Sequence, residues 1–157
     1  MLSRRSFVGQ AAGFGLALAG GKSLWAAASE SAAEPTMTIY MSPTCGCCAK
    51  WVDHVKAAGF VTVVHKDEDM DTVKENLGVP KDLRSCHTAQ VDKYLIEGHV
   101  PAEDIKKLLA MKPKAAGLAA PGMPASSPGM AVPGEPHEPF DILLFQRDGK
   151  SEVFAHR

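Results

Sequence analysis

The sequence predicts an α/β domain, and three observations predict it. Stretches rich in β-branched and apolar residues alternate with segments whose apolar residues recur at helical spacing. A C-x-x-C pair, Cys45 and Cys48, stands where the first expected strand gives way to the first expected helix. The chain has 157 residues, which suits one compact domain and is short for two.

The first strand and the first helix follow from residue periodicity. Residues 37–41 alternate side chains of opposite character, as a strand with two different faces does. Residues 45–58 place Trp51 and Val52 on one side of a helix, and Gly59 ends that helix. The cysteine motif therefore lies at the N-terminus of the helix.

The next elements are a strand, a short helix and a hairpin. Residues 60–65 are rich in valine and predict a second strand. Residues 71–77 predict a short helix, which Gly78 and Pro80 close. Residues 85–100 contain two apolar runs separated by polar residues and predict a β-hairpin.

The C-terminal third combines a helix, a long loop and a final hairpin. A helix is expected over 101–111, because Pro101 and two acidic residues occupy its first turn. Residues 112–139 are dominated by Gly, Pro, Ala and Ser and show no helix or strand pattern. An apolar strand over 140–145 then turns back into 152–154. A loop of the length of 112–139 is usually functional or disordered.

This order of elements is typical of a thioredoxin-like, or glutaredoxin-like, domain. The expected architecture is a central sheet with flanking helices, to which a long Pro/Gly/Met loop and a C-terminal hairpin are added. The domain is expected over 37–157, after an export signal over 1–28 and a linker over 29–36.

The N-terminal segment has the three parts of an export signal. Arg4 and Arg5 precede a mildly apolar run over 11–19, and small residues around Ala28 form a cleavage site. The paired arginines resemble the twin-arginine type. The apolar run is too short for a stable membrane span. The mature protein is therefore expected in the periplasm, with no membrane span after signal cleavage.

Composition argues against a role on nucleic acid. The net charge is −1 and aromatic residues make up 6% of the chain, so neither a positive field nor a base-stacking surface is available.

The cysteine cluster predicts soft-metal or thiol chemistry. Cys45, Cys47 and Cys48 lie within four residues, too close together for ordinary structural disulfides. At a helix N-terminus the thiolate form is favoured, and thiolates bind metals or attack disulfides. In a thioredoxin-like fold, the segment with Cys86 and His87 would enter the sheet beside this helix. The two motifs are therefore expected to form one site.

Thiolate and imidazole ligands together select copper as Cu(I), with zinc as the competitor. A closed site of three thiolates and one imidazole would suit structural zinc. Two features favour copper: there are more soft ligands than one zinc ion needs, and Met123 and Met130 offer thioethers from the long loop. His99 is a further candidate at the end of the hairpin. For each of these three residues the alternative is an ordinary loop or strand residue.

Four motifs stand in order along the chain. They are Pro43-Thr-Cys-Gly-Cys-Cys48 with Lys50-Trp51, then Ser85-Cys-His-Thr-Ala89, then Ile96-Glu-Gly-His-Val-Pro101, and finally Pro121-Gly-Met-Pro with Ser127-Pro-Gly-Met130. Together they resemble the CopG-like proteins over essentially the whole mature chain. That resemblance implies a thioredoxin-like fold, a periplasmic place, copper handling or resistance, and copper bound by Cys45, Cys47, Cys48, Cys86 and His87. It also implies that copper changes oxidation state, between Cu(I) and Cu(II), as one possible activity.

Three functions stay open at this level. The first is a copper-binding protein that sequesters, carries or redox-converts copper, alone or with other periplasmic copper-handling proteins. The second is a thiol–disulfide oxidoreductase that uses Cys45 and Cys48. The third is a structural zinc module that binds a partner. Cys47 separates the first two, because a dithiol enzyme has no use for it and would be exposed to mixed disulfides.

Overall fold

The computed structural model describes residues 34–157. The predicted export signal and most of the predicted linker lie outside these residues. Within them, no helix combines the length and the apolar character that a membrane span requires. The first strand begins at Thr36.

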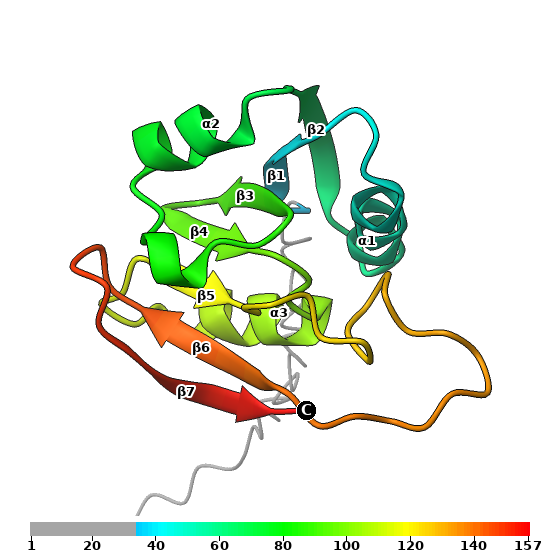
Figure 1. The fold of residues 1–157 in the computed structure, drawn as a ribbon. Coiled ribbons are helices and arrows are strands. Elements are labelled where there is room, and N and C mark those ends of the chain that lie inside the picture. The colour runs from blue at the N-terminus through cyan, green and yellow to red at the C-terminus, as the bar shows by residue number, and fades with distance from the viewer. Residues whose placement is uncertain (1–33) are drawn as a thin grey trace, which may run out of the picture. The chain divides into compact units, whose positions relative to one another are not determined.

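A seven-stranded mixed sheet forms the centre of the domain (Figure 1). Its order is β2-β1-β3-β4-β5-β6-β7, with parallel pairing between β1 and β2 and between β4 and β5, and antiparallel pairing elsewhere. The strands are β1 Thr36–Met41, β2 Val61–Lys66, β3 His87–Val91, β4 Tyr94–Glu97, β5 Gly117–Ala119, β6 Asp141–Phe145 and β7 Ser151–His156.

Among residues 34–157, three α-helices and one short 3-10 helix accompany the sheet. They are α1 Gly46–Ala57, α2 Met70–Leu77, α3 Ala102–Met111 and the 3-10 turn η1 Lys81–Leu83. Helix α1 buries Cys48, Trp51, Val52 and Val55, so the cysteine motif belongs partly to its core-facing side. Parallel pairing of β1 with β2 requires a crossover, and α1 supplies it.

The main core anchors the cysteine helix to the middle of the sheet. Met37 and Ile39 of β1, Trp51 of α1, and Ile96 of β4 are completely buried in one cluster. Burying an aliphatic or aromatic side chain of this size contributes about 1.5–3 kcal/mol. The Trp51 indole N–H also donates to the Val100 carbonyl oxygen at 2.8 Å, which ties α1 to the chain just after β4.

The α/β class is confirmed, and the predicted strands and helices appear within a few residues of their expected bounds. The prediction that 112–139 contains no strand is wrong, because β5 lies inside it. The three buried residues of β5 are too few to show the alternation of inward and outward side chains. Gly117 fits its position because it has no side chain. A Cβ at that position would overlap the Leu95 carbonyl oxygen. β5 is therefore defined by the close packing of its backbone against β4, and the sequence shows no hydrophobic pattern that would reveal it.

Candidate metal centre

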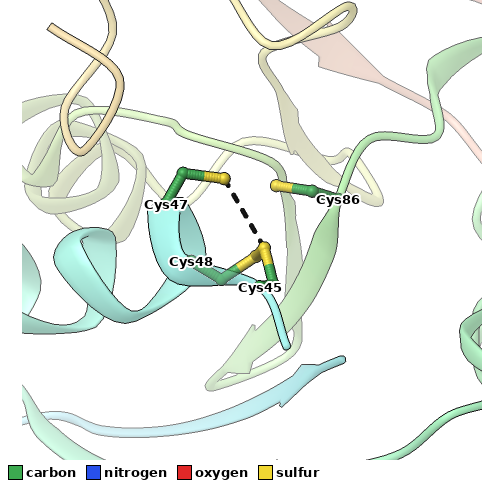
Figure 2. A group of neighbouring side chains, drawn as sticks. All are labelled: Cys45, Cys47, Cys48 and Cys86. Carbon is green, nitrogen blue, oxygen red and sulfur yellow. Dashed lines mark hydrogen bonds between the residues drawn. A yellow bond between two sulfur atoms is a disulfide. The ribbon is translucent and has the colours of Figure 1, made fainter. Parts of the chain in front are cut away.

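The first half of the site is the N-terminal turn of α1. Cys45 is the N-cap residue, and Cys47 and Cys48 follow in the first turn. Figure 2 shows the Cys47 and Cys86 sulfur atoms pointing toward each other across a short gap, with the other two cysteines below. The Cys45 and Cys47 sulfur atoms are 3.5 Å apart. Cys48 is completely buried, whereas the other three cysteines are half-buried.

Cys45 and Cys48 are joined by a disulfide, so the expectation that the clustered cysteines lie too close together for one is wrong for this pair; Cys47 and Cys86 are free thiols. A disulfide sulfur is not a thiolate, so this pair can serve as two metal ligands only after reduction. Reduction adds two electrons and two protons and breaks the one S–S bond. The structure thus represents the oxidised form of the cysteine cluster.

The second half of the site comes from the ends of β3 and β4. Cys86 precedes β3, His87 is its first residue, and His99 follows β4 by two residues. Antiparallel pairing of β3 with β4 brings these residues to the same end of the hairpin. The Cys86 sulfur lies 3.0 Å from His99 Nε2 and 3.3 Å from His87 Nδ1.

The two halves meet, as the sequence predicts. Cys45, Cys47, Cys48 and Cys86 present ligand atoms that all lie within 4.8 Å of one another. Cys48, Cys86, His87 and His99 form a second group that meets the same limit. The groups share Cys48 and Cys86, so the six side chains form two adjoining sets of soft donors with two sulfur atoms in common.

The orientation of His99 is set by the long loop. His99 Nδ1 lies 2.7 Å from the Pro128 carbonyl oxygen, and a carbonyl oxygen can only accept a hydrogen bond. Nδ1 therefore carries a proton. Burial lowers the pKa of His99, which favours the neutral ring. In the neutral ring Nε2 then has a free lone pair, and this atom faces Cys86.

His87 is a completely buried imidazole with one unused nitrogen. Its Nε2 has no hydrogen-bond partner, although buried polar atoms normally have one. Burial, helped by His99 and the Lys74 ammonium, holds the pKa of His87 well below its usual range, so the ring is neutral. The Trp51 ring packs against it with centroids 4.3 Å apart. A neutral imidazole with one ring nitrogen free of hydrogen bonds can serve as a metal ligand.

The Cys86 thiol is protonated at neutral pH. Burial, and then the neighbouring Cys47, raises the pKa of Cys86 to about 12. A metal ion must therefore displace the proton of the Cys86 thiol when it binds. The thiol proton can meanwhile be donated to the free lone pair of His99 Nε2.

This raised pKa predicts a slow, strongly pH-dependent alkylation of Cys86. In the metal-free protein the rate with iodoacetamide is expected to rise about tenfold per pH unit below the pKa, since the thiolate is the reacting species. Peptide mass spectrometry after timed reaction at pH 7, 8 and 9 measures this rate separately for each cysteine. A Cys86 rate that levels off by pH 8 would contradict the assignment.

The long loop closes over the site through its backbone. Gly129 lies so close to α1 that a Cβ there would be 2.8 Å from the Cys47 carbonyl oxygen and 2.9 Å from the Trp51 amide nitrogen. In Figure 1 this loop runs from β5 past the end of α1 before returning to β6. The segment around Pro128 and Gly129 is therefore part of the wall of the site.

The two methionine candidates have different surroundings from the cysteines. Met123 is 43% exposed, and Met130 is half-buried and lines a hollow formed within the loop with Val132, Glu135 and His137. Their part as ligands stays a prediction. His54 is engaged elsewhere, because its Nε2 accepts a hydrogen bond from the Ala102 amide at the start of α3.

Sequence reasoning named the six residues that the structure brings together, but it missed what holds them. His99 carried only a weak signal, and the structure places it in the second group. The parts played by the Pro128 carbonyl and by Gly129 were missed, because backbone contacts leave little trace in side-chain patterns. The glycine in each Pro-Gly-Met repeat was the one feature of the sequence that could have indicated a close backbone contact there.

Known proteins similar to this chain are found among solved structures. One, named copper resistance protein CopG form 1, is 40% identical with a TM-score of 0.73, and the match covers 79% of this chain and 98% of that chain. Another, named form 2 of the same protein, is 38% identical with a TM-score of 0.73 and the same coverage. A protein-family model described as "Protein of unknown function, DUF411" matches residues 83–130. No curated protein matches the chain.

Proposed function

The chain belongs to the CopG family of copper resistance proteins, and on that premise we propose that it binds Cu(I) at the paired cysteine and histidine groups. The single observation that carries the proposal is the convergence of four sulfur atoms and two imidazoles at one end of the sheet. Thiolates and imidazoles are the donors that Cu(I) prefers, and the residues present fit that ion.

More than one copper ion per chain is proposed. The two groups share Cys48 and Cys86, and a thiolate sulfur has enough lone pairs to bridge two ions. One zinc ion would use four of the six donors and leave two unused. The surplus of soft donors favours a small cluster of Cu(I) ions over structural zinc.

The experiment is metal analysis after anaerobic Cu(I) loading, with and without prior reduction. The oxidised chain offers Cys47, Cys86, His87 and His99, and reduction adds Cys45 and Cys48. We expect the reduced protein to hold more than one copper ion per chain and more copper than the oxidised protein. A single tightly held zinc ion that excludes copper would sink the proposal.

A thiol–disulfide exchange activity is the second candidate, and the Cys45–Cys48 disulfide favours it. A surface hollow beside Cys45 has both apolar and charged residues in its lining and leaves room for a partner next to the disulfide; these residues include Met41, Pro43, Val52, Val64, Asp53, Lys56 and Lys66. Cys47→Ser separates the candidates. Cys45 and Cys47 both belong only to the four-cysteine group, so Cys47→Ser is expected to reduce copper binding as much as Cys45→Ser. A dithiol oxidoreductase would instead keep its exchange activity without Cys47.

The fold and the place of action complete the proposal. The parallel β1-α1-β2 unit, followed by the antiparallel β3-β4 hairpin and α3, supports a thioredoxin-like fold with an added loop and hairpin. The paired arginines near the N-terminus support export to the periplasm, where copper would be sequestered, passed to other copper-handling proteins, or converted between Cu(I) and Cu(II).

A further inference from the structure

A buried polar network lies behind the Cys86 segment. Lys74 of α2 and Glu97 of β4 form an ion pair with 2.6 Å between Nζ and Oε1, and their side chains are 3% and 0% exposed. Lys74 also donates to the Thr88 hydroxyl at 2.8 Å, and that hydroxyl donates to Glu97 Oε2 at 2.5 Å. No part of this network belongs to either donor group.

Stability alone is a poor explanation for a buried ion pair. Removing two charges from water is expensive, and replacing such a pair by apolar residues of similar volume is often neutral or stabilising. A buried pair beside a candidate binding site therefore calls for a positional explanation.

Glu97 has one more contact, and it leads to the site. Its Oε1 accepts a hydrogen bond from the Ser85 backbone N–H at 2.6 Å, one residue before Cys86. On the other side of Cys86, the His87 carbonyl oxygen accepts a hydrogen bond from the Gly98 N–H at 3.0 Å. The backbone on each side of Cys86 is thus fastened to the same short segment of the neighbouring strand.

Gly98 lets these two segments approach closely. A Cβ on Gly98 would lie 2.7 Å from the Ser85 side chain and 2.9 Å from the Ala120 carbonyl oxygen. The same segment continues into His99, whose Nε2 faces the Cys86 sulfur. A shift of the Ser85 backbone would therefore change the distance from Cys86 to its partners directly.

We propose that Glu97, held in place by Lys74, is the positioning residue that presents Cys86 to the copper ions. This inference rests on the proposed copper function. Lys74 fixes the carboxylate from α2, and the carboxylate fixes the backbone of the Cys86 segment by accepting the Ser85 N–H. Neither residue touches copper.

Two double variants test this assignment. Lys74→Met with Glu97→Gln removes both charges but keeps a side-chain oxygen that accepts the Ser85 N–H. Lys74→Met with Glu97→Leu removes the charges and the acceptor while leaving the volume similar. We expect near wild-type Cu(I) affinity in the Gln variant and a 10–100-fold weaker affinity in the Leu variant, the range found when outer partners of metal ligands are removed.

A readout without copper separates this inference from the proposed function. In the reduced, metal-free protein, alkylation of Cys86 at fixed pH is expected to be several-fold faster in the Leu variant than in the Gln variant, since both variants lack the Lys74 charge, which lowers the pKa of Cys86. Equal alkylation rates in the two variants, or equal copper affinities, would overturn the role of the position 97 acceptor. If wild-type protein binds no copper, the proposed function fails while the alkylation result still decides the positioning role.

Two controls guard against a general loss of folding. Asp104→Asn breaks another buried carboxylate contact, to Arg157, at α3 and away from Cys86. It is expected to lower the urea midpoint while leaving Cys86 alkylation unchanged. Hydrogen exchange in the wild-type protein needs no variant: a protected Ser85 amide is expected, and a freely exchanging one would overturn the inference even if the Leu variant does not fold.

Discussion

The proposed function predicts that replacing Cys86 with serine removes most of the bound copper. Cys86 belongs to both donor groups, and its sulfur contacts His99 and His87 at 3.0 and 3.3 Å. Serine keeps the size and an O–H that can donate to His99 Nε2, but its hydroxyl does not become a thiolate at neutral pH. The loss in Cu(I) affinity should exceed about 100-fold, the upper end for outer-partner changes, since a shared ligand is lost.

Competition with a colorimetric Cu(I) chelator under anaerobic conditions measures this loss. Cys47→Ser is the matched control, because it removes one sulfur from one group only. It should bind more copper than Cys86→Ser at every chelator concentration. Unchanged copper content in Cys86→Ser would show that the two motifs do not act on one site, and the proposed function would then need a different ligand set.

Replacing Gly129 with alanine is expected to detach the long loop from the site. Gly129 has φ of +87°, a conformation that costs a residue with a side chain about 1–2 kcal/mol. The new Cβ would also overlap backbone atoms of Cys47 and Trp51 in α1, and overpacking of this kind costs about 1–3 kcal/mol. The helix backbone cannot move alone, so the loop must withdraw and break the Pro128–His99 hydrogen bond.

Limited proteolysis within 121–139, the urea midpoint and copper content together check this outcome. Gly134→Ala is the matched control, since Gly134 has φ of +91° and nothing within 4 Å of its would-be Cβ. It carries the backbone strain without the overlap. The Gly129 variant should be cut faster and hold less copper than the Gly134 variant. Equal cleavage rates and equal copper content would mean that the close approach of Gly129 to α1 does not matter for copper binding.

Sequence reasoning reached the candidate metal ligands more easily than the residues that hold them in place. Cys45, Cys47, Cys48, Cys86 and His87 are visible because clustered cysteines and a Cys-His pair are rare and chemically specific. The element order could be predicted because each strand and helix longer than a few residues carries its own periodicity. β5 could not, because three small buried residues have no period to detect.

The residues that position the site, Lys74 and Glu97, could not be predicted from the sequence for a different reason. Lys74 lies in a helix whose other residues are largely polar, and nothing in its spacing distinguishes it from a solvent-exposed lysine. Glu97 likewise reads as an ordinary charged residue at a strand end. Only the tertiary packing of α2 against the sheet buries them together. The oxidation state of Cys45 and Cys48 was also open, since the same C-x-x-C spacing serves a metal site and a disulfide.

The convergence of three distant chain segments has a consequence for the lifetime of the protein in a cell. Copper bound between the α1 turn, the β3-β4 ends and the His99 that the loop carbonyl holds would cross-link those segments. A ligand that binds only the folded state stabilises it by about 2.7 kcal/mol at a hundredfold excess over its Kd. Copper-free chains should therefore be degraded faster than loaded ones, so that the abundance of the protein rises with copper supply even at constant synthesis. Pulse-chase measurement of the protein's half-life with and without added copper would test this dependence of degradation on copper supply.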